Sequence, residues 1–82
     1  MTAKPYPIVI VEWRDAHNYL DWRDTDSIKK IKNHTQVVRS VGFLIEKNKR
    51  EILLAFGLSA DGEVESTLAI PRDWCQKIRR IG

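Results

Sequence analysis

Cysteine is almost absent from this sequence, and its single residue, Cys75, excludes several classes of protein. One cysteine cannot form a disulfide within the chain, nor can it supply a multi-thiolate zinc cluster in one subunit. Long apolar runs are also missing, and no segment approaches the roughly 20 residues that span a bilayer. The N-terminal segment, residues 1–7, lacks the apolar core of a secretory signal peptide. We therefore expect a cytoplasmic protein that does not contact a membrane.

Catalytic and phosphate-loop motifs are missing as well. The four glycines, Gly42, Gly57, Gly62 and Gly82, stand apart, so no Gly-rich loop can form. His17 and His34 do not have metal-ligand spacing, and we interpret them as polar surface residues. Cys75 lies beside Trp74, which is typical of a small packing residue rather than a nucleophile. The sequence predicts a protein that is not an enzyme and that uses neither a metal nor a cofactor.

The chain has 82 residues, which predicts one domain over residues 1–82 with a single small core. Domains of this size commonly gain stability from a staple or from self-association. With no disulfide available within the chain, we expect a homo-oligomer.

Positive charge is in slight excess and is clustered. The chain has fourteen Lys and Arg residues and eleven Asp and Glu residues, which gives a formal net charge of +3. Three basic groups occur within residues 29–32, 47–50 and 72–80, whereas acidic residues concentrate between Glu12 and Asp26. Clustered cations favour an anionic partner. The alternative, a solvated surface that keeps the protein soluble, stays open.

Runs of β-branched and aromatic residues predict most of the secondary structure. Residues 8–13 are expected to form a strand whose core side chains are Val9, Val11 and Trp13. A curved hairpin is expected over residues 36–58; Gly42 in its first strand indicates a bend, a bulge or a close backbone approach. Its second strand is expected to bury one apolar face, formed by Ile52, Leu54, Phe56 and Leu58.

The remaining segments predict a short helix and two further strands. Asp26 or Ser27 is expected to cap a helix over residues 28–32, inside a long connection from residue 16 to 35. Residues 64–70 alternate as a strand, and Pro71 ends it. A 3₁₀ turn at residues 72–74 and an edge strand at 75–81 complete the chain, with a C-terminal helix as the alternative. The predicted fold is mostly β, a small five-stranded barrel or curved antiparallel sheet with one short helix in its first connection.

This order of elements is similar to the topology of small SH3-like and Sm-like barrels. Four short motifs stand out at residue level: Val11-Glu12-Trp13-Arg14-Asp15, Ser40-Val41-Gly42-Phe43-Leu44, Ile70-Pro71-Arg72 and Ile78-Arg79-Arg80-Ile81. Together these motifs resemble a group of short phage-encoded proteins of uncharacterised function. The resemblance implies an accessory protein in the cytoplasm of a bacterial host cell, and it supplies no catalytic residue.

Aromatic and basic residues supply the candidate binding site. Tyr19 and Trp22 lie beside Arg23 in the long connection, where a planar base can stack and a phosphate can pair. Further phosphate contacts are expected from guanidinium groups. They belong to Arg39, Arg72, Arg79 and Arg80. The alternative is structural: Trp13 and Trp74 are core residues, Trp22 covers an open end of the barrel, and the arginines lie on the surface.

The sequence therefore predicts a non-enzymatic module that binds an anionic nucleotide-type ligand and sequesters it, for example a signalling nucleotide of the host. Two alternatives belong to other classes. A nucleic-acid-binding barrel uses the same cations as a continuous stripe. An inhibitor of a host protein uses the exposed aromatic patch or a free strand edge instead.

Overall fold

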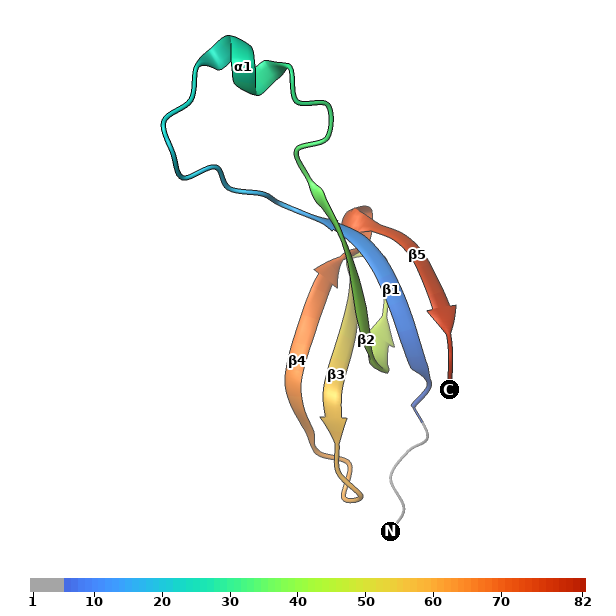
Figure 1. Cartoon of the computed structure of the whole chain (residues 1–82). Helices are drawn as coiled ribbons and strands as arrows, with labels where there is room; N and C mark the ends of the chain where they lie inside the picture. The colour runs from blue at the N-terminus through green and yellow to red at the C-terminus, as the bar shows by residue number, and fades with distance from the viewer. Residues whose placement is uncertain (1–5) are drawn as a thin grey trace.

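The computed structural model describes residues 6–82 and shows one antiparallel sheet with a projecting connection (Figure 1). Part of the N-terminal segment considered above, residues 1–5, lies outside the described residues. The elements in chain order are β1 (Ile8–Asp15), α1 (Thr25–Lys29), β2 (Gln36–Lys47), β3 (Glu51–Leu58), β4 (Val64–Pro71), the 3₁₀ helix η1 (Arg72–Trp74) and β5 (Cys75–Arg80). The predicted mostly-β fold, with five strands and one short helix in the first connection, is confirmed.

The sheet is open rather than closed. Its strand order is β4-β3-β2-β1-β5, and every neighbouring pair is antiparallel. Within residues 6–82 the two edge strands, β4 and β5, do not pair with each other. Of the two architectures that the sequence left open, barrel and curved sheet, the molecule adopts the curved sheet. The C-terminal segment forms the predicted 3₁₀ turn and edge strand, and β5 returns to pair with β1.

One face of the sheet carries the core. Val9, Val11 and Trp13 of β1 are buried, as predicted, together with Ile52 and Leu54 of β3. Ile70 of β4 completes the cluster, and Val38, Leu44, Leu68, Cys75 and Ile78 pack against it. The indole Nε1 of Trp13 donates a hydrogen bond to the Oγ of Ser40 at 3.1 Å. This bond satisfies the one polar atom that the Trp13 side chain brings into the core.

The apolar face predicted for β3 is only partly buried. Ile52 and Leu54 are in the core, but Phe56 is 49% exposed, so its prediction as a core residue is wrong. The β3–β4 register contains no pair at Phe56, and Ser66, near that position on β4, has a φ of 52°. A positive φ at a residue other than glycine interrupts the regular pleat. The ladder is therefore irregular where Phe56 would otherwise be covered.

Gly42 marks a close approach between backbones, one of the roles predicted for it. A Cβ at this position would lie 2.9 Å from the carbonyl oxygen of Ala55 on β3. The register between β2 and β3 also shifts between Leu44 and Glu46. The close approach and the shift lie on the strand that curves through the middle of the sheet (Figure 1).

The connection between β1 and β2, residues 16–35, projects away from the sheet as an arm (Figure 1). The molecule measures 60 Å along its longest axis and only 22 and 21 Å across. The predicted caps for the arm's helix, Asp26 and Ser27, are wrong, because α1 begins at Thr25 with Asp24 as its N-cap. The Asp24 carboxylate accepts a hydrogen bond from the Ser27 amide at 3.2 Å. This bond satisfies one of the amides that a helix start leaves unpaired.

No helix among the described residues has both the length and the apolar character that crossing a membrane requires.

Candidate functional site

A small groove with a cationic rim lies on the face of the sheet opposite the core. Because side chains alternate along a strand, burying Val9, Val11 and Trp13 turns Ile10, Glu12 and Arg14 to the other face. The groove has a volume of about 220 Å³. It is lined by Ile10, Glu12, Arg39, Lys77 and Arg79, and we call it the cationic groove.

Strand register explains why these residues meet. Glu12 lies directly between Arg39 of β2 and Lys77 of β5. Its neighbour on the same face, Ile10, is paired with Arg79. The Nε of Arg39 donates to a Glu12 carboxylate oxygen at 3.2 Å. Three cations therefore surround one carboxylate.

Two of the three cations are free to bind an anion. Within residues 6–82, neither Lys77 nor Arg79 has a hydrogen-bond or ion-pair partner among the contacts found. Arg39 uses only its Nε for Glu12, and a guanidinium has five N–H donors in all. Glu12 cancels one positive charge, so the groove has a net charge of +2 at neutral pH. That excess suits a phosphoryl or carboxylate group.

A second hollow lies where β1, the base of the arm, the 3₁₀ helix η1 and the start of β5 come together. Its volume is about 360 Å³, and we call it the Trp74 hollow. It is lined by Arg14, Asp15, Ala16, Thr35, Asp73, Trp74 and Gln76. Arg14 follows Glu12 by two residues on β1, and Gln76 precedes Lys77 on β5. Arg14 and Glu12, two residues apart on a strand, share a face at about 7 Å, so Arg14 relates this hollow to the cationic groove, although the two have no lining residue in common.

Trp74 gives this hollow an aromatic surface. Its ring stacks on Trp13, with centroids 6.4 Å apart and ring planes inclined by 11°. Trp74 is nevertheless 42% exposed, so the structural alternative, in which Trp74 is a core residue, is wrong for this side chain. The core residue Trp13 holds the ring in place, while a large part of Trp74 is open to solvent. Across the hollow, Nη1 of Arg14 donates to the Oγ1 of Thr35 at 3.2 Å, which ties the base of the arm to β1.

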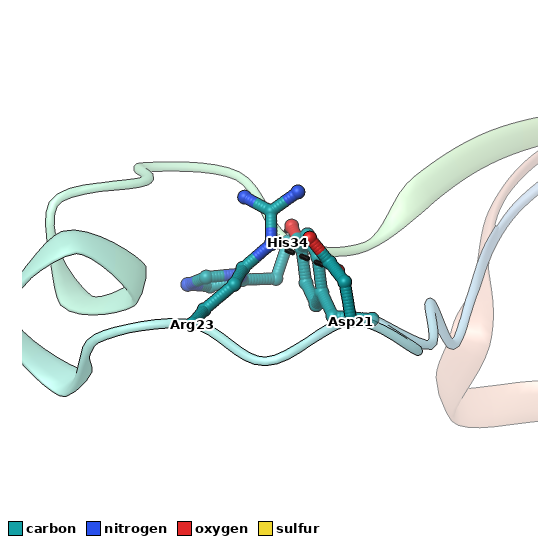
Figure 2. Close-up of polar contacts among 4 residues, drawn as sticks. Asp21, Arg23 and His34 are labelled. Carbon is teal, nitrogen blue, oxygen red and sulfur yellow. Dashed lines mark hydrogen bonds and ion pairs between the residues drawn. The ribbon is translucent and has the colours of Figure 1, made fainter.

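A separate cluster lies on the arm. The Tyr19 ring meets His17 edge-on at 4.7 Å and His34 edge-on at 5.7 Å, and the guanidinium of Arg23 lies 5.0 Å from the Tyr19 ring centroid. Figure 2 shows Asp21, Arg23 and His34 gathered here. The Nε of Arg23 donates to Asp21 at 3.1 Å, and this hydrogen bond lowers the pKa of the Asp21 carboxyl.

Polar contacts tie both ends of the arm together. The Tyr19 hydroxyl and the Nδ1 of His34 share a hydrogen bond of 3.2 Å. The Nε2 of Gln36 lies 3.1 Å from the Nδ1 of His17, and an amide nitrogen can only donate. The two histidines, from opposite ends of the arm, therefore close its base around Tyr19.

The structure divides the predicted site residues among several places. Tyr19 and Arg23 meet on the arm, whereas Trp22 makes none of the ring or polar contacts found among residues 6–82 and is fully exposed. Trp22 therefore covers no end of the sheet. Arg39 and Arg79 meet in the cationic groove.

The last two predicted arginines lie elsewhere. Arg72 lines a smaller hollow of about 120 Å³ beside Cys75. Arg80 pairs with Val9 near the end of β5 and lines none of the hollows described here.

Sequence reasoning did not assign Lys77, Arg14 and Trp74 to the site. The alternation in β1 already placed Glu12 and Arg14 on the face opposite the core. The missing information was the pairing of β1 with β5, which joins residues more than sixty positions apart. With that pairing known, Lys77 and Arg79 follow directly as neighbours of Glu12 and Ile10.

The potentially reactive side chains do not form a catalytic set. The Sγ of Cys75 donates to the carbonyl oxygen of Pro71 at 3.5 Å, and neither histidine contacts this cysteine. Burial raises the pKa of the Cys75 thiol, and the nearby charge of Arg72 partly opposes this effect. Among residues 6–82, no group of three or more His, Cys, Asp or Glu side chains is arranged to hold a metal ion.

Comparison with known proteins gives no family assignment. No family model matches the chain, and no curated protein or solved structure matches it.

Proposed function

We propose that this protein is a non-enzymatic binding module for an anionic nucleotide-type ligand. The observation that carries the proposal is the cationic groove, in which Arg39, Lys77 and Arg79 surround a single carboxylate. Two of these cations have no partner within the described part of the chain. An anion bound in the groove would neutralise these two unpaired cations.

The volumes of the cationic groove and the Trp74 hollow suit a ligand that has a phosphoryl part and an aromatic part. Pockets for complete small molecules measure roughly 300–1,000 Å³. The cationic groove, at about 220 Å³, suits a phosphoryl group better than a whole nucleotide. The Trp74 hollow, at about 360 Å³, offers an aromatic ring that is already held in place by Trp13. In our proposal the phosphates bind Lys77 and Arg79, and the base stacks on Trp74.

Trp74 is a better platform for a base than the aromatic residues singled out from sequence. Tyr19 is surrounded by two imidazoles and a guanidinium, which take up much of its ring. Trp22 lies on the arm and lines neither the cationic groove nor the Trp74 hollow. In our proposal one ligand extends past Arg14 to engage both the cations and Trp74, and stacking of a base on an aromatic residue contributes about 1–3 kcal/mol.

Binding without chemistry implies that the protein acts by holding its ligand. Neither hollow contains a histidine, and Cys75 lines only the smaller hollow beside Arg72. In a bacterial host, the setting implied by the phage-like motifs, such a module lowers the free concentration of a signalling nucleotide. It does so in proportion to the amount of protein present.

Native mass spectrometry of the protein purified from bacterial cells tests the proposal first. We expect a discrete nucleotide-sized mass that is released on heating. Calorimetric titration then uses ADP, inorganic tripolyphosphate and adenosine as probes. ADP should bind most tightly, because it alone engages both the cations and Trp74.

Paired variants locate the site. Lys77→Ala with Arg79→Ala should weaken ADP binding at least tenfold, since two exposed cations are removed and no core contact is lost. The matched control is Lys47→Ala with Lys49→Ala, which removes two cations near the β2–β3 turn and should leave binding unchanged. Equal effects of the two pairs would contradict the groove assignment. An empty protein that binds none of the probes, but binds a labelled oligonucleotide with steep salt dependence, would favour the nucleic-acid alternative.

A further inference from the structure

The arm, residues 16–35, has few contacts that fix its conformation. None of its residues is buried, and only Tyr19, Ile28 and Ile31 are half-buried. Its helix, α1, has five residues, far fewer than the 12–15 that an isolated helix needs for even marginal stability in water. The contacts found within the arm are the Tyr19 cluster, the Asp21–Arg23 ion pair and the Asp24 cap. The arm therefore leaves most of its own surface open to solvent.

The outer part of the arm presents an apolar pair to solvent. Leu20 is 94% exposed and Trp22 is 102% exposed, the two highest values among the large apolar side chains described. A tryptophan buries about 150–250 Å² when it is covered. Leaving this area in water is unfavourable, and exposed apolar side chains that gather on a projecting segment mark a contact surface.

Charge on the arm is divided between its two halves. Residues 21–26 include Asp21, Asp24 and Asp26 against the single cation Arg23. Residues 29–32 include Lys29, Lys30 and Lys32 and no acidic residue. Within residues 6–82 the three lysines form no ion pair. The acidic half therefore complements the basic half, but the two halves are not paired with each other.

We propose that the arm is a self-association surface, and that its partner is the arm of a second copy of this chain. In a two-fold symmetric contact, the same patch is used on both subunits, so the patch must complement itself. Antiparallel arms would set the acidic half of each copy against the basic half of the other. Ile28, between the two halves, would lie nearest the two-fold axis, and Leu20 and Trp22 of each copy would pack on the basic half of the other.

Two arms supply a large part of the area that a specific contact needs. A stable interface buries at least about 1,000 Å² in total. The two copies of Trp22 alone supply about 300–500 Å². Ile28, Ile31 and the aliphatic stems of the lysines supply further apolar area. The charge pattern favours a second copy over an unrelated protein, because an unrelated partner does not require both signs on one short segment.

The test is sedimentation equilibrium of the whole protein and of arm variants. The wild-type protein should form dimers, and Trp22→Ala should raise the dimer dissociation constant at least tenfold. This variant keeps the fold, because the removed side chain is fully exposed. Val64→Ala is the matched control, since it trims another exposed apolar residue, on β4, and should leave the dimer unchanged. Addition of salt should also weaken the wild-type dimer.

A mixing experiment tests the charge pairing itself. One variant carries Lys30→Glu and Lys32→Glu, and the other carries Asp26→Lys. Each alone should dimerise more weakly than wild type. An equimolar mixture should associate more strongly than either variant, because one acidic–basic contact is restored in the mixed dimer. Failure of the mixture to associate would overturn the pairing of opposite halves.

Two other results would also overturn the proposal: a wild-type protein that stays monomeric at several hundred micromolar, or a Trp22→Ala variant that keeps the oligomer intact but loses affinity for ADP. The last would assign the arm to the ligand instead. None of the arm variants alters the cationic groove. If the self-association proposal fails, the proposed nucleotide binding is therefore still tested separately by the calorimetric titrations.

Discussion

Gly42 allows β2 to curve across β3, and replacing it with alanine should destabilise the sheet. The new Cβ would lie 2.9 Å from the carbonyl oxygen of Ala55 and 3.4 Å from the Cβ of Leu54. Neither atom can move alone, because Ala55 is paired with Phe43 in the ladder and Leu54 is wholly buried. Overpacking of this kind costs about 1–3 kcal/mol. In a domain of this size, each kcal/mol lowers Tm by roughly 4–8 °C.

Gly57→Ala is an informative control. Its Cβ would lie even closer to a neighbour, 2.6 Å from the Cγ of Glu65, but that atom belongs to a flexible side chain on the edge strand β4. Glu65 can rotate away, so the change in unfolding free energy should stay within about 1 kcal/mol, as is usual for surface substitutions.

Urea titration followed by tryptophan fluorescence measures both variants, at one fixed protein concentration because the self-association that we propose would contribute to apparent stability. If Gly57→Ala costs as much as Gly42→Ala, then distance rather than the rigidity of the neighbour decides the cost, and the reasoning is refuted.

Three further predictions concern single residues. Ser66→Gly should raise the unfolding free energy by up to about 1 kcal/mol in a urea titration, because Ser66 has a φ of 52° that glycine adopts without strain; no increase would show that Ser66 is unstrained. Asp24→Ala should destabilise α1 by about 1 kcal/mol, and NMR chemical shifts over residues 25–29 should become less helical. The Tm of the whole protein should stay almost unchanged because no α1 residue is buried, and a large fall in Tm would contradict this prediction. Cys75 should react with a disulfide reagent at pH 8 more slowly than in urea, because burial raises its thiol pKa and lowers its thiolate fraction; equal rates would contradict the assignment.

Local patterns in the sequence predicted the parts of the fold that depend on local physics. The alternation of Val9, Val11 and Trp13 identified the buried face of β1, and Pro71 correctly marked the end of β4 before the 3₁₀ turn. The helix in the arm was predicted, but its start was placed too late. Two aspartates two residues apart, Asp24 and Asp26, are both good caps, and only the observed hydrogen bond to Ser27 distinguishes them.

The candidate site could not be derived in the same way, because its residues meet through long-range pairing. Arg39 and Arg79 were named from sequence, but nothing local indicates that β5 lies beside β1. The structural alternative placed Trp74 in the core, and the structure gives it a partly exposed ring. Its exposure depends on the turn at Arg72–Trp74, where the chain changes direction at the rim of the sheet rather than beneath it.

The junction of the arm with the sheet has a consequence for how such a protein can change over time. Asp15 and Gln36, which flank the arm, are paired with each other across β1 and β2. Two antiparallel strands that end on a paired position can be joined by a turn of two residues. The arm could therefore be shortened, lengthened or exchanged without altering the sheet, its core or the cationic groove. The contact surface that we propose on the arm is therefore independent of the strand register, whereas the proposed cationic site depends on the same register that holds the fold together.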